Sequence, residues 1–542
     1  MKYDAWKIKS KYPKNLIRAI IEDRKIKDSQ KFLNPNYKDI YPSRKLSNIR
    51  EASNRIKKAI REKESIGLFC DYDADGVCGG AIIYRTLKHM KADVTEYVPQ
   101  RKEGYGLNDQ AVQFFISKKI KLLITVDCGI KNTEQIKSLS EEGIDSIVID
   151  HHIIDDDLPN AIIIHPELTS DQKNLGLSGG GTAYMLARYL FSENGQEKWL
   201  IDLAAISSVA DVVSLNHDNR IIVKYGMMVL EKTRNKGLKQ LLEVSGILNK
   251  TLSVYDLGFG IAPRLNAAGR IAHPKDSFDL LAKDDVDSRM IAEKLNQLNQ
   301  KRQEMLKASV DEALIKVERG KAGKKNLIIL KGDWDEGIVG LIASKVCEKY
   351  YRPTIVLSES AKQLKGSARS IEKINITSLI SCAEDLLLSF GGHAQAAGLS
   401  LSPKNFKKIK KILEKEAEKF KKNLFERELR VDALVNFDQL TIGQAEEIER
   451  LSPFGPGNPR PILAIENVQI SACELIGKDE NHMKAYCNCN NQNHCFLFFN
   501  FESRDLKVNT GGLFDIAFSL SINEFRGNKK LDLIVEDVKK SK

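Results

Sequence analysis

The sequence predicts an α/β protein with three folded parts: a doubly wound parallel-sheet domain, a second α/β domain and a small all-β module. Three observations support this prediction. Continuous apolar runs alternate with helical stretches from about residue 52 to 230, a long helical pattern follows residue 284, and runs of alternating polarity begin near residue 428. With 542 residues, the chain is too long for one hydrophobic core and suggests three or four domains of about 150 residues.

Charge and composition narrow the function classes. The chain carries a formal net charge of +11, has a pI near 8.9 and is 42% hydrophobic. This basic excess favours an anionic partner, although lysines on solvated faces explain it equally well. The first residues form no signal-peptide core, and about 18 consecutive apolar residues occur nowhere, so we expect a cytoplasmic protein. The nine cysteines are scattered, which suits a reducing compartment.

Three continuous apolar runs predict strands that are buried on both faces of a parallel sheet. They cover residues 65–70, 121–126 and 146–149. Helical patterns at residues 81–90 and 132–142 lie between them, which is the alternation expected of a doubly wound domain. Such domains bind ligands outside the carboxyl ends of their strands, so the residues that follow each run are the first candidates for a site.

Aspartates follow the first two runs. Asp71, Asp73 and Asp75 alternate, and in extended backbone their side chains would all face one way. Gly76 would then allow a sharp turn into the next helix. Both signals have structural alternatives, because aspartate is common in turns and Asp127, after the second run, is a residue type that caps helices.

The third run ends in Asp150, His151 and His152, and two adjacent histidines after a buried strand have no packing role. Imidazole is a common metal ligand. Asp211 is a lone acid in an apolar segment, and burial of its charge would require a cation, a metal or a helix cap. So many carboxylates and imidazoles exceed the needs of one ion. Two ions about 3.5–4 Å apart fit better, and mixed oxygen and nitrogen ligation favours Mn²⁺, with Mg²⁺ as the alternative.

In this order the motifs resemble those of the DHH phosphoesterase superfamily and, within it, of the RecJ single-strand-specific exonucleases. The metal ligands that this resemblance implies are Asp73, Asp75, Asp127, His151 and Asp211. It also implies catalytic roles for three further residues. His152 would contact the scissile phosphate, Asp150 would orient the histidines from behind, and Asp71 would either bind metal or support a ligand.

Other segments resemble motifs that bring RecJ side chains to the substrate. The residues that they imply are Arg101, Tyr105, Arg264, Asn266, Arg270, Ser367, Arg369 and His393. Guanidinium groups suit this role because their forked donors match phosphate oxygens. In residues 262–270, small side chains around the arginines suggest a backbone shaped for close approach, whereas one arginine alone would indicate a surface charge. Residues 99–106 are shorter between arginine and glycine than the family motif.

The second α/β domain is predicted from strands at residues 327–330 and 354–357 around a helix at residues 337–350. It resembles the DHH-associated domain. Residues 334–340 resemble a further motif of the family, but Asp335 stands where histidine is expected.

Two features of this domain have alternative interpretations. The glycines before His393 could end a helix that carries residues 386–388, or the small residues that follow could bring backbone close to a ligand. Lysines crowd residues 404–422, but an apolar stripe accompanies them, so we expect a solvated helix face and not a nucleic-acid site.

The helical pattern from about residue 284 to 318 would span roughly 50 Å, and we interpret it as a helix that connects two domains. A coiled-coil dimer is the alternative, but Asn296, Asn299 and Gln300 interrupt any apolar seam, which makes a monomer the expectation.

The alternating runs after residue 428 predict the all-β module, and by resemblance it is an oligonucleotide-binding (OB) barrel, whose leading motif matches residues 453–459. Most of its aromatic residues are expected in the barrel core. A zinc cluster is a second interpretation of part of the module, with Cys487, Cys489, Cys495, His482 and His494 as ligands. The spacing fits zinc poorly and favours a β-hairpin.

The resemblance therefore implies the following division: N-terminal segment 1–50, DHH metal-binding α/β domain 51–283, connecting helix 284–320, DHH-associated α/β domain 321–427 and OB-fold β-barrel 428–542. It implies a 5′→3′ exonuclease that hydrolyses single-stranded DNA to mononucleotides in repair and recombination, with hydroxide activated by two Mn²⁺ ions. Its expected partners are single-stranded DNA, a single-strand-binding protein and a repair helicase. The alternatives are a phosphodiesterase for short oligonucleotides or cyclic dinucleotides, and a catalytically silent DNA-binding scaffold.

Overall fold

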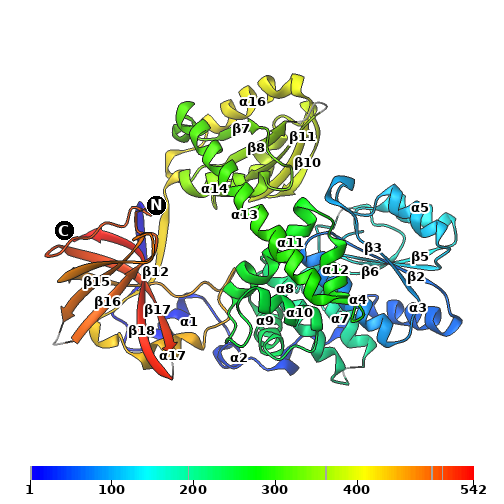
Figure 1. Ribbon diagram of the computed structural model, residues 1–542, viewed down its shortest axis with the longest axis horizontal. Coiled ribbons are helices and arrows are strands. Elements are labelled where there is room, and N and C mark those ends of the chain that lie inside the picture. Colours follow the sequence, from blue (N-terminus) through cyan, green and yellow to red (C-terminus); the bar gives the residue numbers. More distant parts are fainter. Residues whose placement is uncertain are drawn as a thin grey trace. The chain divides into compact units, whose positions relative to one another are not determined.

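The computed structural model describes residues 3–154, 156–192, 194–359, 363–489, 492–502, 504–525 and 527–541. The chain divides into two compact units, whose elements are drawn in Figure 1. The parallel-sheet unit comprises Pro35–Met305 together with Pro453–Pro459. The composite unit comprises Met1–Asn34, Leu306–Ser452 and Arg460–Lys542. Among the described residues, no helix combines the length and the apolar character needed to span a bilayer.

A five-stranded sheet forms the centre of the parallel-sheet unit, and all its strands run parallel, which confirms the predicted fold class. Across the sheet the strands are β3 (Val94–Tyr97), β2 (Ile66–Cys70), β4 (Leu122–Val126), β5 (Asp145–Ile149) and β6 (Ile162–Ile164). The three apolar runs form β2, β4 and β5. The edge strands β3 and β6 were not predicted, because they have only four and three residues.

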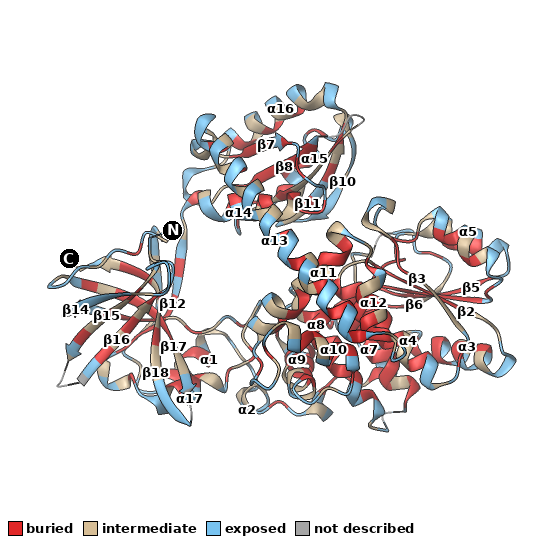
Figure 2. Cartoon of the chain, in the orientation of Figure 1, coloured by how far each residue is buried: buried red, intermediate tan, exposed pale blue. Residues whose placement is uncertain are grey.

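Helices cover both faces of this sheet, which explains why its strands are apolar without alternation. Leu122 and Ile124 of β4 pack into one core cluster with the helices α4 and α7, whereas Leu123 packs into another with α5 and α6. In Figure 2, much of this sheet is coloured as buried. The helices of the unit are α3 (Ile49–Glu62), α4 (Ala74–His89), α5 (Asp109–Ser117), α6 (Thr133–Glu141), α7 (Gly179–Leu190), α8 (Ile201–Ala210), α9 (His217–Leu230), α10 (Lys236–Val244), α11 (Ala262–Ile271) and α12 (Lys275–Ala282).

The start of α4 differs from the prediction. The helix begins at Ala74 and not at residue 81, because Asp73 Oδ1 accepts hydrogen bonds from the backbone N–H groups of Asp75 and Gly76. Gly76 therefore lies inside the helix. A Cβ atom there would lie 2.5 Å from the carbonyl oxygen of Asp71, so close packing, and not turn freedom, requires this glycine. The three alternating aspartates do not share an extended backbone.

The composite unit contains the second α/β region of the chain. This region follows α13 (Ser288–Arg319), which is the predicted long helix. Its five-stranded sheet has the order β10 (Leu387–His393), β11 (Ala396–Leu401), β9 (Leu364–Arg369), β8 (Thr354–Glu359) and β7 (Ile328–Gly332). Only β7 and β8 pair in parallel. The alternative of a helix at residues 386–388 is wrong, because Leu387 begins β10. The helices of this α/β region are α14 (Val339–Tyr350), α15 (Ile376–Ser381) and α16 (Phe406–Glu418). As expected, α16 buries only its apolar stripe.

An eight-stranded sheet completes the composite unit, with α1 (Leu16–Asp23), α2 (Ser29–Leu33) and α17 (Ile442–Glu449) as its helices. Its order is β1 (Ala5–Lys11), β12 (Glu428–Leu434), β13 (Leu463–Gln469), β17 (Leu513–Phe525), β18 (Asn528–Lys540), β16 (Gln492–Phe498), β15 (His482–Cys489) and β14 (Ala472–Ile476). The N-terminal strand β1 pairs in parallel with β12, far along the chain.

The cysteine-rich segment forms the predicted hairpin, because β15 and β16 pair antiparallel with Cys487 opposite His494. Its turn, residues 490 and 491, lies outside the described residues. In the part of the chain that the structure describes, these cysteines and histidines form no group with metal-site spacing. Phe496 and Phe498 are fully buried, so these aromatic side chains belong to the barrel core.

Candidate metal centre

The ends of three neighbouring strands bring acids together at one edge of the parallel sheet. Asp71, Asp127 and Asp150 directly follow β2, β4 and β5, and their backbone N–H groups still bond to the adjacent strands. Asp71 N donates to Val126 O at 3.2 Å, and Asp127 N donates to Ile149 O at 2.8 Å. The sheet ladder therefore holds the three backbones side by side.

His151 lies at the centre of these acids. Its Nε2 atom is 3.1 Å from Asp127 Oδ1, 3.6 Å from Asp75 Oδ2 and 3.8 Å from Asp211 Oδ2. The groups with ligand atoms close enough to share a metal ion are Asp127–His151–His152, Asp75–His151–Asp211 and Asp71–Asp73–Asp127. The structure thus brings together all the metal ligands and catalytic residues that the sequence suggested, except that Asp150 lies behind them. Two of the groups share Asp127 and two share His151.

Two of the buried carboxylates each have an oxygen atom that accepts no hydrogen bond from the described residues. Oδ1 of Asp71 and Oδ1 of Asp127 are inaccessible to solvent and accept no hydrogen bond among the described residues. Both side chains are almost fully buried, where such an oxygen is costly without a compensating cation. A site for divalent cations fits these residues, because carboxylate oxygens and imidazole nitrogens are suitable ligands for Mn²⁺ or Mg²⁺.

The pKa values of the buried aspartates also indicate a cation site. Burial raises the pKa of Asp71 and Asp127 well above the usual range, and the neighbouring carboxylates raise it further. The same causes raise the pKa of Asp75 to about 6 and that of Asp211 to about 9. A cation would remove this repulsion and favour the ionised forms.

Asp150 has a different environment, because donors surround it. Oδ1 accepts hydrogen bonds from His151 N at 2.7 Å and from His152 Nδ1 at 2.8 Å, and Oδ2 accepts one from Ile130 N at 3.0 Å. Burial alone would raise the pKa of Asp150, but the bond from His152 and the backbone donors lower it. The carboxylate therefore stays ionised, holds the backbone of His151 and orients the ring of His152.

Backbone strain also marks this edge. Asp127 has a φ of 62°, which is uncommon for residues other than glycine. It does not cap α6, whose N-terminal capping residue is Asn132, so the alternative of a helix cap is wrong. Tyr105 supports the strained residue: its hydroxyl donates to Asp127 O at 2.9 Å and also lies 2.9 Å from His152 Nδ1.

Asp75 is held by residues that the sequence analysis did not find. Backbone N–H groups of Gly179 and Gly180, at the start of α7, donate to its carboxylate at 2.8 and 2.7 Å, and Ser207 Oγ donates at 2.5 Å. A Cβ atom on Gly179 would lie 2.6 Å from Asp127 Oδ1. The run of three glycines after Ser178 was the available signal, because such runs permit close backbone approach.

The predicted substrate residues of this unit lie in different places. Asn266 Oδ1 accepts a hydrogen bond from Ala74 N at 2.9 Å and so holds the first residue of α4, which lies between Asp73 and Asp75. The Arg101 guanidinium stacks on Tyr72, 4.5 Å from the ring centroid, and its Nε donates to Gly269 O.

The two arginines of α11 differ. Arg264 donates to Gly260 O and to Asn296 Oδ1, so its guanidinium is bound within the helical part of the unit. Arg270 acts electrostatically on Tyr72, as Arg101 does, and both arginines lower the pKa of that phenol, which burial raises overall to about 12.

In the composite unit, Ser367 and Arg369 lie on one face of β9, two residues apart. Arg369 Nη1 donates to Ser367 Oγ at 2.8 Å, and a Cβ atom on Gly340 in α14 would lie 3.1 Å from both groups. His393 on β10 lies opposite Ala396 on β11, and Ala396 lies opposite Arg369 on β9. The small side chain of Ala396 therefore stands between His393 and Arg369. Asp335 Oδ1 accepts a hydrogen bond from Gly337 N and shapes the turn before α14.

Comparisons with known proteins show which family this chain belongs to. The domains described as "DHH family, N-terminal domain", "DHHA1 domain" and "RecJ OB domain" match residues 65–208, 324–419 and 431–537. The single-stranded-DNA-specific exonuclease RecJ of Haemophilus influenzae is 32% identical over 95% of this chain and 92% of that protein. The chain belongs to the RecJ family.

Other RecJ proteins extend this comparison. RecJ of Bacillus subtilis is 36% identical over 93% of this chain, which spans 65% of that protein. The crystal structure of RecJ from Thermus thermophilus with Mn²⁺ superimposes with a TM-score of 0.84 at 27% identity, covering 99% of this chain and 80% of that one. The corresponding structure with Mg²⁺ has a TM-score of 0.78 at 26% identity, covering 99% and 79%. The C-terminal β module is thus an OB domain, as the sequence resemblance implied.

Proposed function

We propose that this RecJ family member is a metal-dependent exonuclease that hydrolyses single-stranded DNA from its 5′ end to 5′-mononucleotides during repair and recombination. One observation carries the proposal: in the strand-end cluster of buried aspartates around His151, Asp71 Oδ1 and Asp127 Oδ1 accept no hydrogen bond from the described residues, and His151 Nε2 lies 3.1 Å from Asp127 Oδ1. The names of the relatives, which are exonucleases specific for single-stranded DNA, support the substrate.

The implied ligand set, Asp73, Asp75, Asp127, His151 and Asp211, would hold two Mn²⁺ ions, with Mg²⁺ as the alternative. When bound, such ions supply Lewis-acid activation of water and of the phosphate group. Two donor groups share Asp127, and two share His151, which supports two neighbouring sites. RecJ structures that contain Mn²⁺ and Mg²⁺ support the choice of ions.

The chain's own groups would orient and stabilise the phosphate. Burial lowers the pKa of His152, but the hydrogen bond from its ring to Asp150 raises it above the ordinary histidine value overall. The protonated ring is therefore favoured and can donate to a phosphate oxygen. Arg101 and Arg270, near Tyr72, supply further positive charge in the same unit. In the composite unit, Ser367, Arg369 and His393 would bind a phosphate of the strand.

The division of the chain into residues 1–50, 51–283, 284–320, 321–427 and 428–542 is part of this proposal. The last part would bind the DNA strand, as OB domains do. We also propose that the enzyme acts in the cytoplasm as a monomer, with a single-strand-binding protein and a repair helicase as partners.

The substitution Asp127→Ala tests the proposal. In Mn²⁺, the variant should release no mononucleotides from a single strand labelled at its 5′ end, whereas its affinity for the strand should remain. The matched control Asp93→Ala removes an exposed carboxylate of the same unit that takes part in no described contact and should retain full turnover. Products resolved by length and by labelled end provide the measurement.

The same assay separates the alternatives. Faster cleavage of a dinucleotide than of a long strand would indicate a phosphodiesterase for short substrates. Absence of cleavage by the unmodified protein in either metal, with DNA binding retained, would indicate a silent scaffold. Turnover by Asp127→Ala would contradict the assignment of the site.

A further inference from the structure

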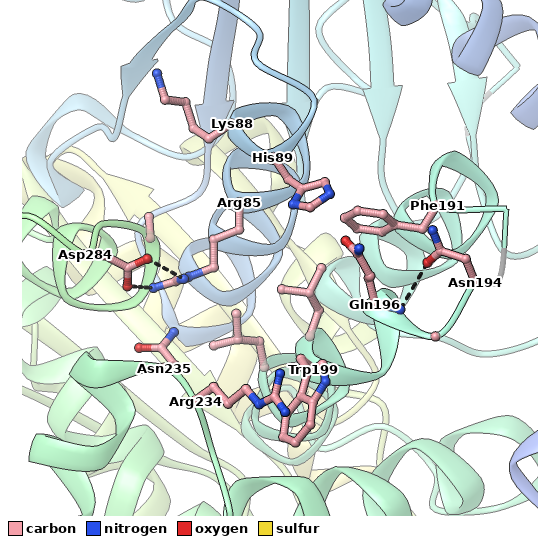
Figure 3. Close-up of a pocket in the computed structure, with 14 residues that line it drawn as sticks. Arg85, Lys88, His89, Phe191, Asn194, Gln196, Trp199, Arg234, Asn235 and Asp284 are labelled. Atoms are coloured by element: carbon pink, nitrogen blue, oxygen red, sulfur yellow. Dashed lines mark hydrogen bonds and ion pairs between the residues drawn. The ribbon is translucent and has the colours of Figure 1, made fainter.

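A cavity in the parallel-sheet unit lies at the opposite end of α4 from the metal-centre aspartates, and Figure 3 draws the residues that line it. Its volume is about 670 Å³. Asp73 and Asp75 belong to the N-terminal turn of α4, whereas Arg85 and Lys88, in its C-terminal part, line the cavity. The 16 residues of this helix span about 24 Å. The cavity is therefore distinct from the metal centre.

Positive charge predominates among the described residues that line the cavity. Arg85, Lys88 and Arg234 are cationic, and Asp284 is the one carboxylate. Asp284 is already paired with Arg85, at 2.9 Å from Nη2 to Oδ1. Within the described part of the chain, no carboxylate pairs with Lys88 or Arg234. An anionic ligand would supply the missing counter-charge.

The cavity also offers a flat aromatic surface. The Arg234 guanidinium lies 3.7 Å from the centroid of the Trp199 ring, and 37% of this tryptophan is exposed. Stacking holds the guanidinium flat, and its N–H donors remain available at the edge. Leu200 and Leu203 contribute apolar surface beside the indole. In Figure 3, Arg234 and Trp199 lie against each other on one side of the cavity.

We propose that this cavity binds a single 5′-nucleotide, with its phosphate at Arg234 and its base against Trp199. The volume falls within the range of about 300–1,000 Å³ that is usual for small-ligand sites. A bare inorganic anion would leave the aromatic and apolar wall unused. A DNA strand needs a groove for about four or more nucleotides, which this cavity does not provide. The inference does not depend on the proposed nuclease activity.

Tryptophan fluorescence of the full chain, with EDTA present to keep metal out of the catalytic centre, tests the proposal. Titration with deoxyadenosine 5′-monophosphate should quench the fluorescence to saturation, and Trp199→Phe should remove the quenching. Arg234→Ala should weaken binding about ten-fold, because it removes both the charge and the stacked plane. Deoxyadenosine alone and inorganic phosphate alone should each bind about ten-fold more weakly or worse.

Two controls make the result specific. Lys232→Ala removes the same charge two residues away, on an exposed side chain outside the cavity, and should leave the affinity unchanged. Asp127→Ala should also leave it unchanged. Absence of saturable quenching would overturn the proposal. An affinity that Asp127→Ala abolishes and Arg234→Ala leaves intact would also overturn it, because the nucleotide would then occupy the metal centre.

Discussion

Ser207 Oγ donates a hydrogen bond to Asp75 Oδ1, and both side chains are almost completely buried. Ser178, the N-terminal capping residue of α7, places its own hydroxyl 2.6 Å from that of Ser207. Two serines from different helices thus form a chain of hydroxyl groups behind one carboxylate. This chain leaves Asp75 a single orientation, in which Oδ2 lies toward His151.

Ser207→Ala should therefore weaken metal binding without unfolding the protein. A hydrogen bond to a charged group contributes about 1.5–3 kcal/mol, so we expect the affinity for Mn²⁺ to fall about ten-fold or more. Calorimetric titration with Mn²⁺ in the absence of DNA measures this directly. Ser208→Ala is the matched control, because among the described residues Ser208 Oγ bonds only to Ala204 O in its own helix. Equal Mn²⁺ affinities for both variants would refute the positioning role.

Asn266 should act on turnover and not on strand binding, because it holds the backbone of Ala74. Asn266→Ala should lower kcat about ten-fold with little change in KM for single-stranded DNA. Asn266→Asp, which keeps an acceptor at this position, should recover part of the loss. A rise in KM at constant kcat would instead support the direct substrate contact that the sequence suggested.

The stability of the metal-free protein should fall as pH rises. The pKa of Asp211 is raised from 3.8 to about 9, first by burial and then by Asp75 and Asp73. Between pH 3.8 and about 9, the folded chain keeps a proton on Asp211 that the unfolded chain releases. The contribution of Asp211 to the free energy of unfolding is therefore complete below pH 3.8 and is lost as the pH rises toward about 9.

Asp211→Asn tests this expectation, because asparagine cannot ionise. In EDTA, the free energy of unfolding of the variant relative to the unmodified protein should improve steadily across that pH window. Denaturant titrations at several pH values measure it. A difference that is constant with pH would show that Asp211 titrates normally. Added Mn²⁺ should make the unmodified protein more stable than Asp211→Asn, because only the aspartate can bind the ion with a full negative charge.

Trp6 joins the N-terminal strand to the OB domain. Its indole Nε1 donates to Asp537 Oδ2 at 2.6 Å, and Asp537 is fully buried. Trp6→Phe should lower the free energy of unfolding of this domain by about 1–3 kcal/mol, because a buried carboxylate oxygen loses a donor. The rate of amide hydrogen exchange in β12 and β18 measures this loss of stability. Trp199→Phe, at a partly exposed tryptophan in the other unit, should leave exchange there unchanged.

Local sequence patterns predicted much of the fold. The continuous apolar runs of β2, β4 and β5 indicated strands buried on both faces, and the acids after them indicated where a site would form. The edge strands β3, which mixes polar and apolar residues, and β6, which has only three residues, escaped prediction. The start of α4 was misplaced, because Asp73 acts as a helix cap in a segment whose alternating aspartates suggested extended backbone.

The sequence by itself determined which residue types stand at the carboxyl ends of the strands, because that order is a local property of the chain. Only the tertiary structure decided how they are held. Ser207 and Gly179 reach Asp75 from helices more than a hundred positions away in the chain, and Asn266 reaches Ala74 from farther still. These contacts depend on helix packing over the sheet edge, and no local pattern encodes the distance between two helices.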